Sequence, residues 1–218
     1  MSKVCVLVGA GPGVGHSVAK KFLDKGYSIA LMARSAEKLT AMKNQLGEAN
    51  VSTWTVDVSD SESLLNAMSS VAKQHGSPEI LVFNAYSAAP GKPTDLQAKA
   101  LEESFVVNVT SALIASQAVI PAMKQAGKGT IVFTGGGFAL YPLSDLTALS
   151  IGKAGLRALS NCLHQELKPL GIHAGTVTIC GTVEAGGPFD PDKIADTFVE
   201  FHDQSPESFA PEIMFQGR

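Results

Sequence analysis

The first residues of the chain combine a short apolar strand, a glycine-rich turn and the start of an amphipathic helix. Residues 4–8 are apolar over the length of one buried strand, and glycine then occupies positions 9, 11, 13 and 15. Apolar side chains return at helical spacing from Val14 onward. Glycine accepts positive φ angles and lets a ligand come close to the main chain, while the first turn of a helix offers free N–H groups to an anion. The unit therefore predicts a site for a nucleotide pyrophosphate.

The spacing of these glycines distinguishes between two turns of this kind. The pattern G-x-G-x-x-G would require glycine at position 14, which is Val14, whereas G-x-x-x-G-x-G fits Gly9, Gly13 and Gly15. The second pattern resembles the turn of the short-chain dehydrogenase/reductase family. A glycine-rich turn that binds nothing is the alternative, but four glycines between a strand and a helix favour a ligand. The resemblance implies cofactor contacts from Gly9, Gly11, Pro12, Gly13, Val14 and Gly15.

Length and composition restrict the classes of protein that fit this start. The 218 residues carry a formal net charge of −3 and suit one α/β domain over residues 1–218. A slightly acidic chain does not favour a nucleic-acid surface, and there is no run of about 18 apolar residues that would predict a membrane span. No metal-ligand motif is found, and Cys5, Cys162 and Cys180 are far apart, so we expect buried, reduced thiols. The expectation is a cytoplasmic protein.

Strand and helix patterns alternate along the rest of the chain, which is typical of a doubly wound parallel sheet. Strands are predicted at residues 4–8, 28–33, 51–56, 80–83, 130–134, 173–179 and 213–215. Helices are predicted after the glycine turn and at residues 36–46, 61–74, 96–124, 146–167 and 192–201, the last capped by Asp190. The resemblance implies a single Rossmann-type domain whose seven strands have the order 3-2-1-4-5-6-7.

The residues after the second strand predict which dinucleotide binds. Enzymes that use NAD usually carry an acid here, which bonds the adenosine ribose, but this chain has no acid before Glu37. Arg34 instead offers a planar bidentate donor for a phosphate, and Ser35 and Lys38 are placed to assist it. The alternative is a solvated arginine at a helix start. The position beside the ribose favours NADP(H).

Three further positions match cofactor-binding motifs of the resembling family. An Asp-Val pair after the third strand, here Asp57 and Val58, is implied to contact the adenine ring, with helix capping as the alternative for the carboxylate. Asn84 and Ala85 follow the fourth strand and match half of the family's Asn-Asn-Ala-Gly. Val183 follows the sixth strand, where the family has a Val or Ile against the carboxamide. The resemblance thus covers essentially the whole chain.

The catalytic motif of the family is incomplete in this chain. Members carry a serine after the fifth strand and Tyr-x-x-x-Lys in the next helix, where the lysine shares a helix face with the tyrosine and lowers its pKa. Lys153 matches the lysine, but Leu149 stands at the tyrosine position and Gly136 at the serine position. Asn108 lies in an Asn-Val-Thr match, and its family role is to hold a proton-relay water. Lys153 is also implied to bond the nicotinamide ribose.

Tyr86 stands where the family has glycine, close to the expected place of the nicotinamide. It is a candidate substitute acid, or it narrows the site, or it turns outward in a loop. The candidates for catalysis are therefore Asn108, Lys153 and Tyr86. The segment 184–190 is short for a substrate lid, so we expect an open substrate side.

These motifs leave two functions open. The first is a weak or atypical NADP(H)-dependent oxidoreductase that acts on a carbonyl or alcohol by hydride transfer. The second is a non-catalytic NADP(H) sensor or binding protein. The resemblance further implies a homodimer or homotetramer, with residues 101–124 and 146–167 as candidate interfaces.

Overall fold

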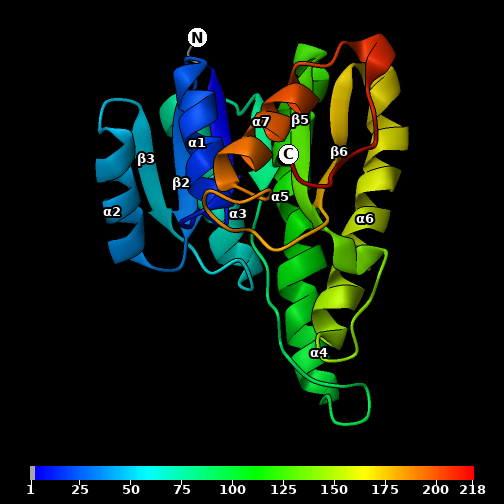
Figure 1. Cartoon of the computed structure of the whole chain (residues 1–218). Helices are drawn as coiled ribbons and strands as arrows, with labels where there is room; N and C mark the ends of the chain where they lie inside the picture. Colours follow the sequence, from blue (N-terminus) through cyan, green and yellow to red (C-terminus); the bar gives the residue numbers. More distant parts are fainter. Residues whose placement is uncertain (1–2) are drawn as a thin grey trace.

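The computed structural model describes residues 3–218, and Figure 1 shows a central sheet with helices on both faces. The sheet has seven strands in the order β3-β2-β1-β4-β5-β6-β7, so the predicted fold and strand order are confirmed. The strands are β1 (Val4–Val8), β2 (Ser28–Ala33), β3 (Val51–Thr55), β4 (Ile80–Phe83), β5 (Gly129–Gly136), β6 (Ile172–Ile179) and β7 (Glu212–Phe215). Every neighbouring pair is parallel, so the carboxyl ends of all strands share one edge.

Two layers of helices bury the two faces of the sheet. One layer holds α1 (Val14–Asp24), α2 (Ala36–Leu46) and α7 (Pro191–His202), and the other holds α3 (Ser61–His75), α5 (Ser111–Ala126) and α6 (Thr147–Leu167). In β1, Val4, Val6 and Val8 enter one core cluster while Cys5 and Leu7 enter the other. Both faces of the central strands are covered, which explains why their sequences are continuous apolar runs.

The long helix predicted over residues 96–124 is not regular throughout. The structure divides it into α4 (Ala98–Phe105), a π-helical turn η1 (Val106–Thr110) and α5. In the middle of η1, the side chain of Asn108 accepts a hydrogen bond from the N–H of Ser87 and donates one to the Ser87 carbonyl. Helical periodicity could not show this π turn.

The helical segment 98–126 is long and apolar enough to cross a membrane, judged by length and composition alone. The sequence expectation concerned an unbroken run of about 18 apolar residues, and polar residues such as Asn108, Thr110 and Gln117 interrupt this segment. In the fold, α5 packs against β4, β5 and α3, and its buried side chains Ala112, Ala115, Val119 and Met123 belong to the core. Packing in the helical layer therefore accounts for one apolar face of this segment.

Two smaller predictions also need correction. The fifth strand continues past residue 134, because Gly135 and Gly136 pair with the end of β6. Of the three cysteines, Cys5 is buried, but Cys180 is only partly buried and Cys162 is exposed. Cys162 lies on α6 beside Leu163, whose side chain is buried, so it takes the outward face of that helix. The expectation of buried thiols is therefore wrong for these two residues.

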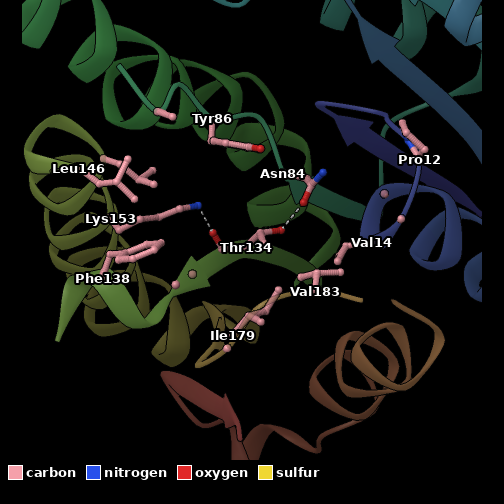
Figure 2. Close-up of a pocket in the computed structure, with 17 residues that line it drawn as sticks. Pro12, Val14, Asn84, Tyr86, Thr134, Phe138, Leu146, Lys153, Ile179 and Val183 are labelled. Carbon is pink, nitrogen blue, oxygen red and sulfur yellow. Dashed lines mark hydrogen bonds between the residues drawn. The ribbon is translucent and has the colours of Figure 1, made fainter. Parts of the chain in front are cut away.

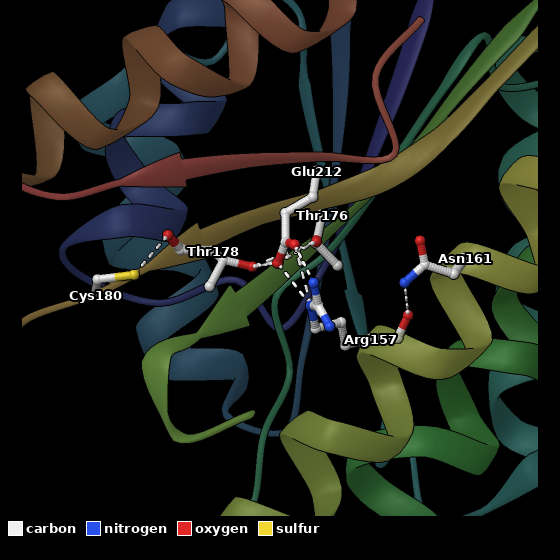
Figure 3. A network of polar contacts seen from close by, with 6 residues as sticks. All are labelled: Arg157, Asn161, Thr176, Thr178, Cys180 and Glu212. Carbon is white, nitrogen blue, oxygen red and sulfur yellow. Dashed lines mark hydrogen bonds and ion pairs between the residues drawn. The ribbon is translucent and has the colours of Figure 1, made fainter. Parts of the chain in front are cut away.

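A polar network fastens the last strand to α6 (Figure 3). The carboxylate of Glu212 in β7 accepts three hydrogen bonds from the guanidinium of Arg157 in α6, at 2.7–3.0 Å, and one from the hydroxyl of Thr178 in β6 at 2.6 Å. Burial raises the pKa of Glu212, but these donors outweigh burial and hold it below its usual range. The network thus fixes the edge strand beside the carboxyl end of β6.

Candidate active site

The carboxyl ends of β1, β4, β5 and β6 surround a cavity of about 450 Å³ (Figure 2). β1 and β4 are neighbours in the sheet although β2 follows β1 along the chain. The cavity therefore lies where the strand order reverses, which is where ligands bind in open α/β sheets. The glycine turn lines one side of it, and side chains from α6 line another.

Two glycines of the turn have left-handed backbone angles and serve different purposes. Gly9 has φ +87°, and a Cβ added to it would lie 2.2 Å from the backbone nitrogen of Ala85. Gly9 therefore lets β1 and the segment after β4 approach each other. Gly13 has φ +81°, and its nearest neighbour, Cγ of Pro191, would be 4.0 Å from an added Cβ. The space beside Gly13 is thus free for a ligand.

The N-terminus of α1 opens toward this free space. Gly13 is the N-cap of α1, and no side chain caps the helix there. Gly13, Val14 and Gly15 all line the cavity. Uncapped N–H groups and the helix dipole favour an anion at such a position. The turn therefore fits a dinucleotide pyrophosphate, both by shape and by electrostatics.

Asn84 connects the glycine turn to the strands beneath the cavity. Its Nδ2 donates a hydrogen bond to the carbonyl of Gly9 at 2.8 Å, and its Oδ1 accepts one from the hydroxyl of Thr134 at 2.9 Å. A Cβ on Gly15 would lie 3.3 Å from the same Nδ2. One amide thus holds the ends of β1, β4 and β5 in register, which fixes the turn relative to α6.

Lys153 is a buried cation that continues the hydrogen-bonded series from Asn84 through Thr134. Its Nζ donates a hydrogen bond to the carbonyl of Thr134 at 2.7 Å, and the residue is 8% exposed. Burial lowers the pKa of Lys153 from its ordinary value to about 8. The ring of Tyr86 has its centroid 5.8 Å from Nζ, within range of a cation–π contact. Tyr86 itself is 62% exposed, so it stands at the open side of the cavity.

The surroundings of Lys153 are otherwise apolar. Leu149 is buried, lines the cavity and lies one helical turn before Lys153. Gly136 also lines the cavity, and a Cβ there would lie 3.6 Å from Cε of Lys153. Phe138 and Leu146 complete this wall. Neither leucine nor glycine can donate a proton from its side chain, so the two positions leave the wall without a hydroxyl.

Comparison with known proteins decides the family. The family model described as short chain dehydrogenase matches residues 3–186. The chain belongs to the short-chain dehydrogenase family. An uncharacterized oxidoreductase of Staphylococcus aureus strain USA300 is 26% identical over 176 residues, which are 81% of this chain and 76% of that protein. The family consists of oxidoreductases that bind nicotinamide cofactors.

Two solved structures show the same fold. A metagenomic short-chain oxidoreductase in complex with NADP is 27% identical, with a TM-score of 0.87 over 98% of this chain and 97% of that one. A short-chain dehydrogenase from Rhodopseudomonas palustris is 20% identical, with a TM-score of 0.89 over 99% of each chain. The overlap includes both the glycine turn and α6, because nearly the whole chain is covered.

The residues that the short-chain dehydrogenase motifs place near the adenosine lie outside the cavity, at the ends of β2 and β3. Arg34 is exposed. Hydrogen bonds from Ser59 hold the pKa of Asp57 below its usual range, and the charge of Arg34 contributes in the same direction. The hydroxyl of Ser35 accepts a hydrogen bond from the N–H of Lys38, which caps α2. Val58 is buried in the core. Gly9, Gly11 and Ala85 also stand outside the cavity lining.

The remaining candidates divide between the cavity and its support. Pro12, Val183 and Tyr86 line the cavity, whereas Asn108 does not. The amide of Asn108 is bonded to the Ser87 backbone and donates to the hydroxyl of Ser104 at 3.0 Å. Its family role in holding a relay water therefore stays a prediction for this chain.

Sequence reasoning missed part of the cavity wall. Thr134, whose carbonyl and hydroxyl join Lys153 to Asn84, ends a predicted strand, as does Ile179. Their positions at carboxyl ends of parallel strands were the available signal. Phe138 and Leu146 lie in segments without a motif, and nothing in the sequence pattern marks them.

Proposed function

We propose that this chain binds NADP(H) and acts as a slow oxidoreductase on an apolar carbonyl compound or alcohol. The observation that carries this proposal is the open, uncapped turn at Gly13, which shares one cavity with the buried Lys153. A dinucleotide that places its pyrophosphate at the turn has its reactive end directed into the part of the cavity that holds Lys153. The bound cofactor would supply or accept the hydride.

The proposal assigns a holding role to each matched residue. The main chain from Gly9 to Gly15 takes the pyrophosphate, with Gly11 and Pro12 at the crest of the turn. Arg34 and Ser35 take the ribose phosphate, because Arg34 is exposed and its planar fork suits a phosphate. Residues that would contact the two rings and the nicotinamide ribose are Asp57, Val58, Asn84, Ala85, Lys153 and Val183.

Proton transfer is the step for which this chain is poorly equipped. The positions beside Lys153 carry Gly136 and Leu149, which have no hydroxyl, and the hydroxyl of Thr134 in β5 already donates to Asn84. Lys153 itself can donate a proton, since its pKa of about 8 is close to neutral pH. Tyr86 is the other cavity residue with a proton to give, and its exposed phenol can exchange it with solvent. We expect turnover to be slow for this reason.

A non-catalytic NADP(H) sensor is the second candidate. The apolar wall at Leu149 favours this candidate, because cofactor binding needs no proton donor.

For both candidate functions we propose a cytoplasmic homodimer or homotetramer. Apolar side chains on the outward faces of the α4–α5 segment and α6 support this assembly, because a partner copy would cover them. Phe105 is 38% exposed and Ile151 is 41% exposed. Analytical ultracentrifugation tests the assembly.

Calorimetric titration of the purified chain tests the binding proposal. We expect NADPH to bind at least about tenfold more tightly than NADH, because one charge-assisted phosphate contact contributes roughly 1.5–3 kcal/mol. Equal affinities would contradict the assignment to NADP(H). No heat with either dinucleotide, in a folded sample, would contradict both candidate functions.

A further inference from the structure

Lys153 is the one buried lysine among residues 3–218, and it has no acidic partner. Lys21, Lys25 and Lys124, for example, each pair with a carboxylate at 2.6–3.0 Å. None of the ion pairs found within residues 3–218 includes Lys153, and its Nζ bonds only to the neutral carbonyl of Thr134. A buried amine without a counter-charge favours its neutral form.

The protonation state of Lys153 follows from this environment. With a pKa of about 8, about a tenth of the amine is neutral at pH 7, whereas an ordinary lysine is neutral only to roughly 0.04%. A neutral amine has a free electron pair and is a nucleophile. In Figure 2 the side chain of Lys153 reaches into the cavity toward Thr134 and Asn84. The nucleophile is therefore directed into the site.

The space around this amine suits an aldehyde with an apolar body. Gly136 adds no side chain beside Cε of Lys153, and Leu149 replaces a phenol one turn earlier. Phe138 and Leu146 extend the apolar wall, and the cavity measures about 450 Å³. Apart from Lys153 and Tyr86, no titratable side chain lines it. An uncharged hydrophobic molecule would bury its surface here without leaving a charge unpaired.

We propose that Lys153 captures apolar aldehydes, its Nζ forming a reversible imine with an aldehyde bound against Phe138, Leu146 and Leu149. This activity goes beyond oxidoreduction and requires no dinucleotide. An aldehyde is favoured over a ketone, because its carbonyl carbon carries only one substituent and is easier to approach within the wall.

The chemistry balances without an added oxidant or reductant. The electron pair of Nζ forms a bond to the carbonyl carbon, and the carbonyl oxygen takes up the proton that nitrogen releases, giving a carbinolamine. The carbinolamine then loses its hydroxyl as water while the C=N bond forms. One amine and one aldehyde give one imine and one water. Protons exchange with solvent on the open side, where Tyr86 is 62% exposed, and water reverses the reaction.

Reductive trapping of the unmodified chain tests this proposal. The full chain is incubated with benzaldehyde and sodium cyanoborohydride, which fixes an imine as a stable amine, and the adducts are located by peptide mass mapping. Lys99, whose side chain is 84% exposed, is the internal control in the same sample. We expect Lys153 to be labelled at least roughly tenfold faster than Lys99 at pH 7, because its neutral fraction is larger.

Three further readouts sharpen the test. Labelling at Lys153 should rise with pH around a midpoint near its pKa of about 8. Lys153→Arg should remove the dominant adduct, and acetophenone should label far less than benzaldehyde. Labelling of Lys153 no faster than Lys99, in a chain shown to be folded by circular dichroism, would overturn the proposal and needs no variant.

A parallel titration separates this inference from the proposed function. NADPH binding is measured by calorimetry on the same preparation. Tight NADPH binding without preferential labelling would overturn the aldehyde proposal alone. Preferential labelling without NADPH binding would overturn the dinucleotide proposal alone. Since both proposals use Nζ of Lys153, we expect saturating NADPH to slow the labelling at Lys153 and to leave Lys99 unchanged.

Discussion

The glycine turn on one side of the cavity and the start of α6 on the other depend on different parts of the chain. At the turn, the functional groups belong to the main chain, and the sequence contributes mainly the absence of side chains at Gly9 and Gly13. On α6 and β5, the family's chemistry needs particular side chains, and this chain has Leu149 and Gly136 there. The proposed function thus joins a cofactor site built from backbone to a reaction site without the acid that the family motif would supply.

The largest expected effect comes from restoring the missing groups. Gly136→Ser with Leu149→Tyr should raise NADPH-dependent reduction of simple aldehydes and ketones by about 10²–10⁴-fold, the usual contribution of general acid catalysis. Position 136 tolerates the serine sterically, since a Cβ there makes only ordinary contact with Lys153, and position 149 lines the cavity. Steady-state rates of NADPH oxidation measure the gain, with Leu149→Phe as the matched control that adds a ring without a hydroxyl. An equal gain in both variants would show that the hydroxyl is not responsible.

Gly13→Val tests the glycine turn on the other side of the cavity. A valine at position 13 would have to adopt φ +81° and would fill the open space beside the turn. We expect nucleotide binding to fall by about 100-fold or more, equivalent to roughly 2.8 kcal/mol, while the fold remains. Calorimetry and circular dichroism measure the two properties separately. If the variant binds NADPH as tightly as the parent, the turn does not hold the phosphate.

Arg34→Ala tests the ribose end with a smaller expected effect. Loss of one charge-assisted contact should weaken NADPH binding by about tenfold or more and leave NADH binding nearly unchanged. Arg34 is exposed and makes no packing contact with the cavity, so stability should hardly change. Lys43→Ala, in the last turn of the same helix, is a suitable control. A parallel loss for both dinucleotides would point to a general charge effect.

Glu212→Gln should affect stability without affecting the nucleotide side. The carboxylate accepts hydrogen bonds from Arg157 in α6 and Thr178 in β6, and its side chain is only 12% exposed. Losing its charge should cost about 1–2 kcal/mol of the free energy of unfolding, between the values for exposed and buried pairs. Urea denaturation measures this cost. A change in NADPH affinity of similar size would show that the edge strand and the glycine turn are coupled.

How far the sequence predicts this molecule differs between its parts. Nearly all elements follow from apolar runs, caps and the glycine turn, because these signals are local, whereas the strand order follows from the resemblance to the short-chain dehydrogenase family. The Asn108 π turn depends on a partner 21 residues away in the chain, so periodicity within one helix does not contain it. The exposure of Cys162 likewise depends on which face of α6 meets the sheet.

The candidate site shows the same division. Motifs placed the glycine turn, Asn84, Lys153 and Tyr86 near one another, and residues 12–15 of the turn line one cavity with these three side chains. The burial that lowers the pKa of Lys153 comes from packing of α6 against β5, which is a property of the tertiary structure. Phe138 enters the wall from a 3-10 turn after β5 and Leu146 from the N-cap of α6, both without any recognisable pattern. Their contribution appears only when the chain is folded.

A single-turnover experiment on the unmodified chain tests most directly whether the protein binds NADPH but oxidises it only slowly. NADPH is bound in the presence of excess protein, its fluorescence reports binding, and its absorbance then reports oxidation after a panel of apolar aldehydes is added. We predict a clear binding signal followed by slow or undetectable oxidation, which Lys153→Met slows further. Brisk oxidation that Lys153→Met leaves unchanged, or no binding signal at all, would contradict this account of the two sides of the cavity.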